Sequence, residues 1–256
     1  MQQPNIIVFM TDHQRGDTIL NNSQVITPNI DRFRSQSVTF TDAYCPAPHC
    51  CPSRATFFSS LYPSEHGVWN NVNVSNTLSR DLFDNVRLFP EDLKQAGYDL
   101  YFSGKWHISA VQSPADFGFD LLYHPNRYRE FPHVPDMKEW ETYGFEHPTD
   151  TGNEPRTEGR IIRPGYHPYV QYGIDESPYD DAEVVDAAVQ KLLHQDTKNP
   201  FFLFVGPLGP HDPYDVPQRF LDWYDINDIH LPDNFADDMT DKPTLYRRTR
   251  DRYAQL

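Results

Sequence analysis

The sequence predicts an α/β fold, and three observations support that prediction. Residues 5–10 and residues 201–205 are continuous apolar runs rich in β-branched and aromatic side chains, which is typical of strands buried on both faces of a sheet. Residues 181–194, just before the second run, carry apolar side chains at helical spacing. With 256 residues, the chain is long enough for one large domain with a substantial core.

Composition and charge exclude several kinds of partner. The formal net charge of −15 argues against nucleic acid, whose binding needs a basic face. An anionic substrate would therefore have to be held by local cations or a metal ion. No apolar run approaches the length of a membrane span, and Met1 to Pro4 lack the basic region of a signal peptide. We therefore expect a cytoplasmic chain with no membrane partner.

The N-terminal part of the chain is predicted to form the first strand, and polar residues follow directly after it. The strand at residues 5–10 leads directly to Asp12 and His13, and open α/β sheets bind ligands at that edge. Taken alone, Asp12 is explained equally well as a loop cap. A helix is expected to begin at Pro28, and the alternating residues 37–41 predict a second strand.

A helix that begins with two adjacent cysteines follows. Pro52 suits its first turn, because the missing N–H of proline costs nothing there and its φ is already helical. We expect this helix to extend to about Leu61. Its free N–H groups and its dipole favour an anion beside Cys50 and Cys51, which places a nucleophile in an anion site.

Two further strands are predicted, each with charged or imidazole side chains directly after it. The strand at residues 98–103 leads to Lys105 and His107. The strand at residues 201–205 leads to a Gly-Pro-rich turn and His211.

The remaining segments are a short helix, a long irregular stretch and an acidic end. Residues 89–96 predict the helix, which a glycine ends. Residues 124–179 lose all periodicity, and we expect a substrate-shaping excursion there. Residues 222–241 are acidic and loop-like, and residues 245–256 predict a helix without terminal punctuation. We therefore expect the chain to be truncated at its C-terminus.

The side chains at the strand ends form a chemically coherent set. Asp12 supplies a carboxylate and Cys50 a nucleophile. The cationic or hydrogen-bonding donors are Arg54, Lys105, His107 and His211. Such a set suits a tetrahedral oxyanion ester, which needs neutralised oxygens, an activated nucleophile and an acid for the leaving group. A divalent cation on the carboxylate would also offset repulsion from the acidic surface.

Each of these residues also has a simpler structural explanation. Cys51 suits a buried small hydrophobe, Lys105 a solvated lysine, and either histidine a core or loop position. A zinc cluster is another alternative, formed from Cys45, His49, Cys50 and Cys51. Adjacent cysteines fit tetrahedral ligation poorly, however, and a second CxxC pair is absent. The shared placement after apolar strands favours an active site over these explanations.

The motifs resemble those of the type I sulfatases. Residues 50–54, Cys-Cys-Pro-Ser-Arg, match the family signature C-x-P-S-R, in which the first cysteine is oxidised to formylglycine. Three companions match in order and spacing: Thr11-Asp12 after the first strand, the run from Gly97 to His107, and His211-Asp212-Pro213. The resemblance covers essentially all of residues 1–256, as the N-terminal portion of the family's catalytic domain.

The resemblance implies an alkaline-phosphatase-like α/β sandwich with a mostly parallel central sheet, helices on both faces, and hydrolysis of a sulfate ester. Formylglycine at the position of Cys50 would be hydrated to a gem-diol. One hydroxyl would attack sulfur, and the other would drive sulfate release by reforming the aldehyde. The implied partners are a sulfated small molecule or carbohydrate and a maturation enzyme that generates formylglycine.

The resemblance also implies a role for each site residue. Asp12 would be a calcium ligand together with the oxygen at Cys50, with His13 at the position of a second ligand. Arg54 would hold the formylglycine and Lys105 would contact a sulfate oxygen. The two remaining histidines divide the other tasks: His107 would hydrogen-bond the formylglycine, and His211 would contact sulfate or protonate the leaving group.

Two departures from the family pattern limit these expectations. His13 stands where the family often has an aspartate, and histidine suits calcium less well. The family's second metal pair and second active-site lysine belong to a C-terminal half that the resemblance does not reach, so we expect weak metal affinity. A related phosphonate or phosphate monoester hydrolase, or a truncated chain without activity, is the alternative.

Overall fold

The computed structural model describes residues 3–20, 24–73, 77–124, 172–174, 180–194, 198–211, 214 and 216–253. The chain divides into two units. The first unit comprises Met1–Gln14, Phe40–Gly144 and Pro178–His211, and the second comprises Arg15–Thr39, Phe145–Ser177 and Asp212–Leu256. Every predicted site residue lies in the first unit.

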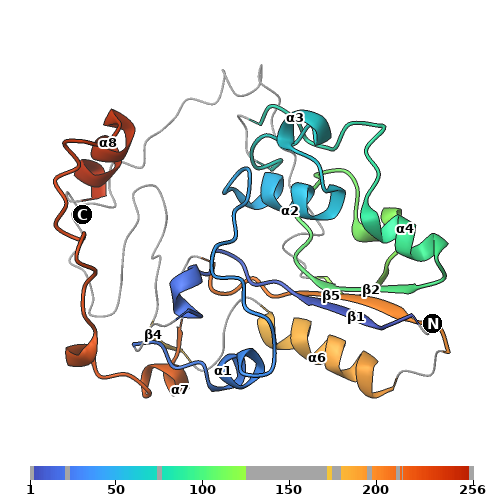
Figure 1. The fold of residues 1–256 in the computed structure, drawn as a ribbon, viewed down its shortest axis with the longest axis horizontal. Helices are drawn as coiled ribbons and strands as arrows, with labels where there is room; N and C mark the ends of the chain where they lie inside the picture. Colours follow the sequence, from blue (N-terminus) through green and yellow to red (C-terminus); the bar gives the residue numbers. More distant parts are fainter. Residues whose placement is uncertain are drawn as a thin grey trace. The chain divides into compact units, whose positions relative to one another are not determined.

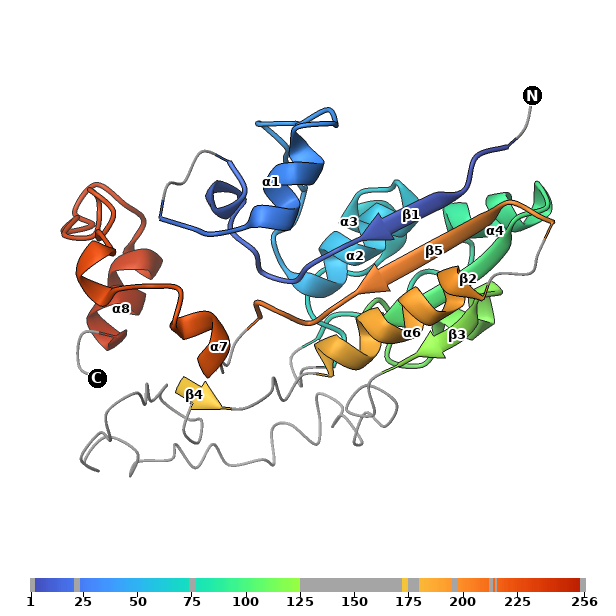
Figure 2. The same cartoon turned by 90° about the horizontal axis from the view of Figure 1, so that it is seen from below.

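A parallel sheet forms the centre of the first unit (Figure 1). Its strands, in spatial order, are β1 (Ile6–Phe9), β5 (Phe201–Gly206), β2 (Asp99–Gly104) and β3 (Asp120–Tyr123). Val8 on one side and Phe102 on the other are both in register with Phe204 of the central strand. Because all neighbouring strands are parallel, their carboxyl ends lie at one edge of the sheet, as Figure 2 shows.

Strands β2 and β5 approach each other closely where they end. Gly104 has φ +109°, and a Cβ atom there would lie 2.1 Å from the carbonyl oxygen of Gly206. The N–H of Lys105 donates to that same oxygen at 2.8 Å. Glycine is therefore required at the exit of β2, and this contact determines where the chain places Lys105.

Helices cover both faces of the sheet. Helix α2 (Cys50–Ser59) and helix α4 (Phe89–Gln95) lie on one face, and helix α6 (Asp181–Leu193) lies on the other (Figure 1). Successive residues of β5 enter opposite cores: Phe204 packs against Phe58 of α2 and Phe202 against Phe89 of α4, whereas Leu203 belongs to the core shared with α6. This alternation explains why the whole strand is apolar. The short helix α3 (Pro63–His66) and the 3₁₀ segment η2 (Pro114–Phe117) complete the described helices of this unit.

The second unit is built from short elements. Its described residues form the helices η1 (Gly16–Thr18), α1 (Pro28–Arg34), α7 (Gln218–Leu221), η4 (Ile226–Asp228) and α8 (Thr244–Tyr253). Strand β4 (Tyr172–Ile174) pairs in parallel with β6 (Val216–Pro217). Across both units, the described residues contain no helix that is long and apolar enough to cross a membrane.

The prediction of a strand at residues 37–41 is wrong. These residues form coil and bends, and Val38 and Phe40 are 82% and 80% exposed. Alternation stabilises a strand only where a neighbouring strand and a core are available, and no described strand pairs with this segment. The sequence patterns also missed β3, a short edge strand with half-exposed side chains.

The excursion predicted for residues 124–179 contains β4 at its end, so it is not wholly irregular. The other residues of that segment, apart from His124, lie outside the described residues, and the excursion's role in shaping a substrate stays a prediction.

Candidate active site

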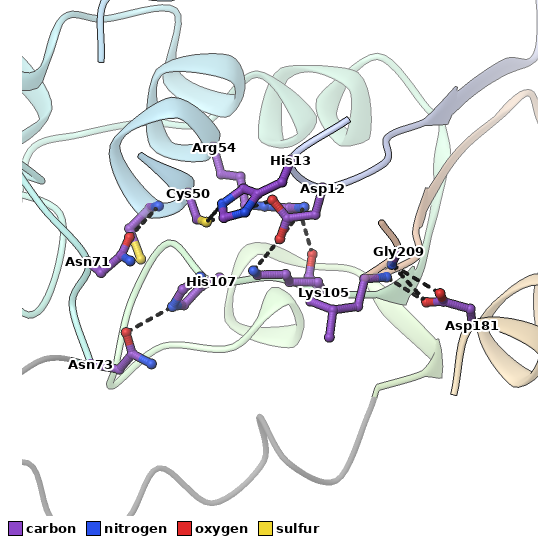
Figure 3. A network of polar contacts seen from close by, with 12 residues as sticks. Asp12, His13, Cys50, Arg54, Asn71, Asn73, Lys105, His107, Asp181 and Gly209 are labelled. Carbon is purple, nitrogen blue, oxygen red and sulfur yellow. Dashed lines mark hydrogen bonds and ion pairs between the residues drawn. The ribbon is translucent and has the colours of Figure 1, made fainter. Parts of the chain in front are cut away.

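Loops at the carboxyl edge of the sheet bring the predicted residues together. Asp12 and His13 follow β1, Lys105 and His107 follow β2, and His211 follows β5. Cys50 and Arg54 come from the first turns of α2, whose N-terminus faces the same edge (Figure 3).

Asp12 is a buried carboxylate held by two cations. The Nζ atom of Lys105 donates a hydrogen bond to Asp12 Oδ2, and Arg54 Nη2 lies 3.8 Å from the same oxygen. Arg54 is itself fixed, because its Nη1 donates to the carbonyl oxygen of Lys105 at 2.9 Å. Burial alone would raise the pKa of Asp12, but the two cations outweigh it and lower that pKa below its ordinary value. Asp12 is therefore an anion near neutral pH.

Cys50 lies beside this carboxylate with a neutral thiol. Its Sγ is 3.0 Å from His13 Nε2 and donates a weak hydrogen bond to Asp12 Oδ1 at 3.7 Å. Burial raises the pKa of the Cys50 thiol, and the negative Asp12 adds to that effect, while Lys105 and Arg54 act in the opposite direction. A thiol in this state is a weak nucleophile, because the thiolate is the reactive form.

His13 and His211 form a stacked pair next to Cys50. Their ring centroids are 4.2 Å apart with an interplanar angle of 19°. His13 has φ +59°, in the left-handed region that a non-glycine residue enters at some cost. The turn before His211 is held by Asp181, whose carboxylate accepts the N–H groups of Leu208 and Gly209 at 2.6 Å and 3.0 Å.

Cys51 has a structural role, because it is buried and hydrogen-bonded within the fold. It is fully buried, its Sγ accepts the N–H of Val72 at 3.4 Å, and its own N–H donates to Asn71 Oδ1 at 3.2 Å. Burial raises the pKa of the Cys51 thiol to about 12. These contacts attach the asparagine-rich turn to the start of α2, and they agree with the simpler explanation of Cys51 as a buried small side chain.

His107 is a buried, neutral imidazole. Its Nε2 lies 3.0 Å from Asn73 Oδ1, an oxygen that accepts, so the proton is on Nε2 (Figure 3). Burial lowers the pKa of His107 well below its ordinary value, and the cations of Lys105 and Arg54 lower it further.

Sequence reasoning missed three residues that support the site: Asn71, Asn73 and Asp181. The only available signal for the asparagines was their clustering in a turn, and Asp181 resembles an ordinary first-turn helix residue. Nothing in a turn pattern says which distant side chain will accept or donate the hydrogen bond.

The three thiols are expected to differ widely in reactivity. Cys45 is exposed, Cys50 is buried with a raised pKa, and Cys51 is buried with a pKa of about 12. In a metal-free maleimide time course on the folded chain, Cys45 should react first and Cys51 at least about 100-fold more slowly, because the thiolate is the reacting form. Fragmentation of the peptide spanning residues 35–54 locates each adduct, and denaturant should make all three react alike. Equal rates in the folded chain would contradict this description of the site.

The structure does not assemble the zinc cluster considered from the sequence. Cys45 is exposed, and the Sγ atom of Cys51 accepts a hydrogen bond from the N–H of Val72. Among the described residues, the group that could hold a metal ion is instead His13, Cys50 and His211, whose ligand atoms all lie within 4.8 Å of one another.

A parallel α/β sheet with a buried carboxylate, two cations and a cysteine at its carboxyl edge defines the class of α/β proteins that carry their functional site at that edge. The sulfatase family profile matches residues 4–256, and this chain belongs to the sulfatase family. Members of this family hydrolyse sulfate esters, and the family generally uses a metal ion and formylglycine.

Two bacterial relatives cover this chain almost completely, and a human relative covers about half of it. A sulfatase of Formosa agariphila is 30% identical over 98% of this chain and 48% of its own length. The arylsulfatase of Clostridium perfringens is 26% identical over 97% of this chain and 51% of its own length. The human N-acetylgalactosamine-6-sulfatase is 30% identical over 56% of this chain. The chain spans about half the length of the first two relatives.

Solved structures share the fold. The protein BT4656, in complex with its substrate D-glucosamine-2-N,6-O-disulfate, superposes with a TM-score of 0.64 at 21% identity, over 96% of this chain and 42% of that one. The phosphonate monoester hydrolase of Agrobacterium radiobacter superposes with a TM-score of 0.60 at 22% identity, over 90% of this chain and 45% of that one. The predicted sulfatase-like α/β fold is therefore confirmed.

Proposed function

We propose that this chain is the N-terminal portion of a sulfatase catalytic domain that hydrolyses sulfate esters of carbohydrates. The observation that carries the proposal is the position of Cys50, which starts α2 beside the buried Asp12 and the two cations Lys105 and Arg54. Membership of the sulfatase family supports the reaction class.

The proposed substrate class rests on what the relatives are named for. One relative is an N-acetylgalactosamine-6-sulfatase, and the solved structures include complexes with D-glucosamine-2-N,6-O-disulfate and with neocarrahexaose. All three names refer to sugars. A sulfated sugar is therefore a better first probe for this chain than an alkyl sulfate.

We propose that Cys50 is converted to formylglycine by a maturation enzyme. The raised pKa of the thiol supports this, because an unmodified Cys50 would be a poor nucleophile at neutral pH. Once formed and hydrated, formylglycine supplies an oxygen nucleophile at this position.

The chain's own residues would then bind and orient the sulfate. Lys105 and Arg54 place two positive charges beside the position of Cys50, and Arg54 cannot swing away while it donates to the Lys105 carbonyl. His107 is neutral, with its Nε2 proton directed at Asn73, so its Nδ1 is an acceptor suited to a hydroxyl donor. Such pre-placed charges and dipoles stabilise the charge that develops on sulfate oxygens.

Calcium fits the described donors only in part. Asp12 Oδ1 faces Cys50, so Asp12, His13 and an oxygen at position 50 would hold the ion, which when bound neutralises sulfate charge. Calcium takes about six to eight oxygen ligands, and these residues supply few of them. We therefore expect the metal affinity of this chain by itself to be weak.

The conversion is tested by mass spectrometry. The 256-residue chain is co-expressed with a formylglycine-generating enzyme, alkylated and digested, and trypsin releases residues 35–54, which contain all three cysteines. We expect two alkylated cysteines and one hydrazide-reactive aldehyde at position 50, and no aldehyde in Cys50→Ala. Three alkylated thiols under these conditions would contradict the proposal.

Activity is then measured on the converted chain with a sulfated amino sugar, an aryl sulfate and an aryl phosphonate. We expect sulfate release that Cys50→Ala lowers by about 10⁴-fold or more, as for loss of a nucleophile. Faster turnover of the phosphonate would favour a phosphonate monoester hydrolase. Complete conversion without any turnover would contradict catalysis by this chain alone.

A further inference from the structure

Three soft or borderline ligand atoms meet at the mouth of the site. Cys50 Sγ lies 3.0 Å from His13 Nε2, and Cys50 Sγ, one ring nitrogen of His13 and one of His211 all lie within 4.8 Å of one another. They come from three different segments, after β1, at the start of α2 and after β5. Cys50 is buried, His13 is exposed and His211 is intermediate, so the cluster lies between the interior and solvent.

The composition of this cluster favours a metal other than calcium. One thiolate and two imidazoles form a ligand set that zinc and similar divalent metals prefer, whereas calcium prefers oxygen. In a tetrahedral zinc site, the same pairs of atoms would be about 3.4–3.6 Å apart. The His13–Cys50 distance of 3.0 Å lies below this range and the 4.8 Å limit of the group lies above it, so the ligand atoms are within a short movement of a zinc site.

One carboxylate oxygen faces the sulfur. The cations Lys105 and Arg54 both approach Oδ2 of Asp12, whereas its Oδ1 faces Cys50 Sγ at 3.7 Å. Asp12 therefore places a negative oxygen beside the sulfur, while the cations Lys105 and Arg54 oppose a metal ion there and favour the thiolate form of Cys50. Asp12 Oδ1 or a water molecule is then available as a fourth ligand, which completes a tetrahedral shell.

We propose that the chain with Cys50 as an unmodified thiol binds one divalent cation of the zinc class through Cys50 Sγ, His13 and His211. Binding displaces the thiol proton to solvent and forms the metal–sulfur bond. The proposal concerns the thiol form and does not depend on the proposed function or on later conversion of Cys50.

Cobalt(II) reports directly on thiolate ligation in such a site. The 256-residue chain is expressed without a maturation enzyme, reduced, freed of metal and titrated with Co²⁺. We expect a near-ultraviolet sulfur-to-cobalt charge-transfer band that saturates at one equivalent and disappears when Zn²⁺ is added. Calcium in large excess should leave the band unchanged.

Substitutions assign the ligands, and the chain offers matched controls. Cys50→Ser should remove the band, and His13→Asn or His211→Asn should each weaken Zn²⁺ binding by at least about tenfold in a chelator competition. Cys45→Ser and His49→Asn change an exposed cysteine and an exposed histidine outside the cluster, so both should bind like the unaltered chain. Zn²⁺ should also raise the melting temperature of the unaltered chain, but not that of Cys50→Ser, by mass action.

Three results would overturn the proposal. They are a charge-transfer band that survives in Cys50→Ser, a loss of affinity in His49→Asn as large as that in His13→Asn, and an unaltered chain that shows no sulfur–cobalt band at saturating Co²⁺. Circular dichroism of each variant establishes that it is folded. If His13→Asn does not fold, His211→Asn still tests whether an imidazole of the cluster contributes to Zn²⁺ affinity, because His211 lies in a different loop.

Discussion

Replacing Lys105 with methionine is expected to lower the free energy of unfolding by about 3–5 kcal/mol, the usual cost of removing one partner of a buried ion pair. The side chains of Lys105 and Asp12 are only 2% and 6% exposed, so the substitution leaves a buried carboxylate with Arg54 as its nearest described cation. Methionine keeps most of the side-chain volume, which separates loss of charge from loss of packing. Chemical denaturation in the presence of EDTA measures the change.

The matched control is Lys94→Met. Lys94 is exposed and donates to the carbonyl oxygen of Gly118, so this change should cost less than about 1 kcal/mol. A double substitution, Asp12→Asn with Lys105→Met, should recover part of the loss because it also removes the carboxylate that had lost its lysine, while the charge of Arg54 remains. If the double variant is as unstable as the sum of the single variants, the pairing of Asp12 with Lys105 is not what holds this site together.

The loss in free energy of unfolding caused by Lys105→Met should also depend on pH. The folded-state pKa of Asp12 lies below its ordinary value, so its ionised form stabilises the folded chain above that ordinary value, and this contribution is lost as the pH falls through the lowered pKa. Without Lys105, burial of Asp12 is opposed mainly by Arg54, and the carboxyl group takes up a proton more readily. The difference in free energy of unfolding between Lys105→Met and the unaltered chain should therefore be larger at about pH 7 than at about pH 4.

Replacing Phe58 with alanine is expected to cost about 3–5 kcal/mol, the range for deletion of a buried aromatic ring. Phe58 is fully buried, and its ring lies 5.1 Å from both Phe204 and Trp106 and 5.8 Å from Phe89, measured between centroids. This contact attaches α2 to the sheet and to α4. Because α2 begins at Cys50, the cavity should also loosen the start of the helix that carries the site.

Phe57→Ala is the control for this prediction. Phe57 is the adjacent residue on the same helix but is 36% exposed, so its loss should cost about 1–2 kcal/mol. Thermal and urea unfolding compare the two variants, and maleimide labelling of Cys50 in the folded state reports on the start of α2. Equal destabilisation by the two substitutions would show that the aromatic core does not anchor α2 as described.

Local sequence patterns were sufficient to predict the frame of the first unit. The apolar runs at β2 and β5 are buried on both faces, as predicted, whereas β1, at the edge of the sheet, exposes Ile7 and Phe9 on one face, so the prediction of burial on both faces is wrong for that strand. The start of α2 was predictable because proline in a first turn has a local cause. The C-x-P-S-R motif and its companions then pointed to the sulfatase family, and the family profile confirms that prediction. The roles assigned to individual site residues stay predictions.

Only the tertiary structure determined which side chains meet. The contacts of Asp12 with Lys105, of His13 with Cys50 and of Asn73 with His107 join residues 34 to 93 positions apart, and no local pattern encodes such distances. The same limit explains the error at residues 37–41, where alternation was present but a partner strand was not. The sequence by itself determined which residues reach the carboxyl edge of the sheet. Burial and strand order, which depend on the whole fold, decided their protonation, their partners and the cluster of sulfur and imidazole ligands.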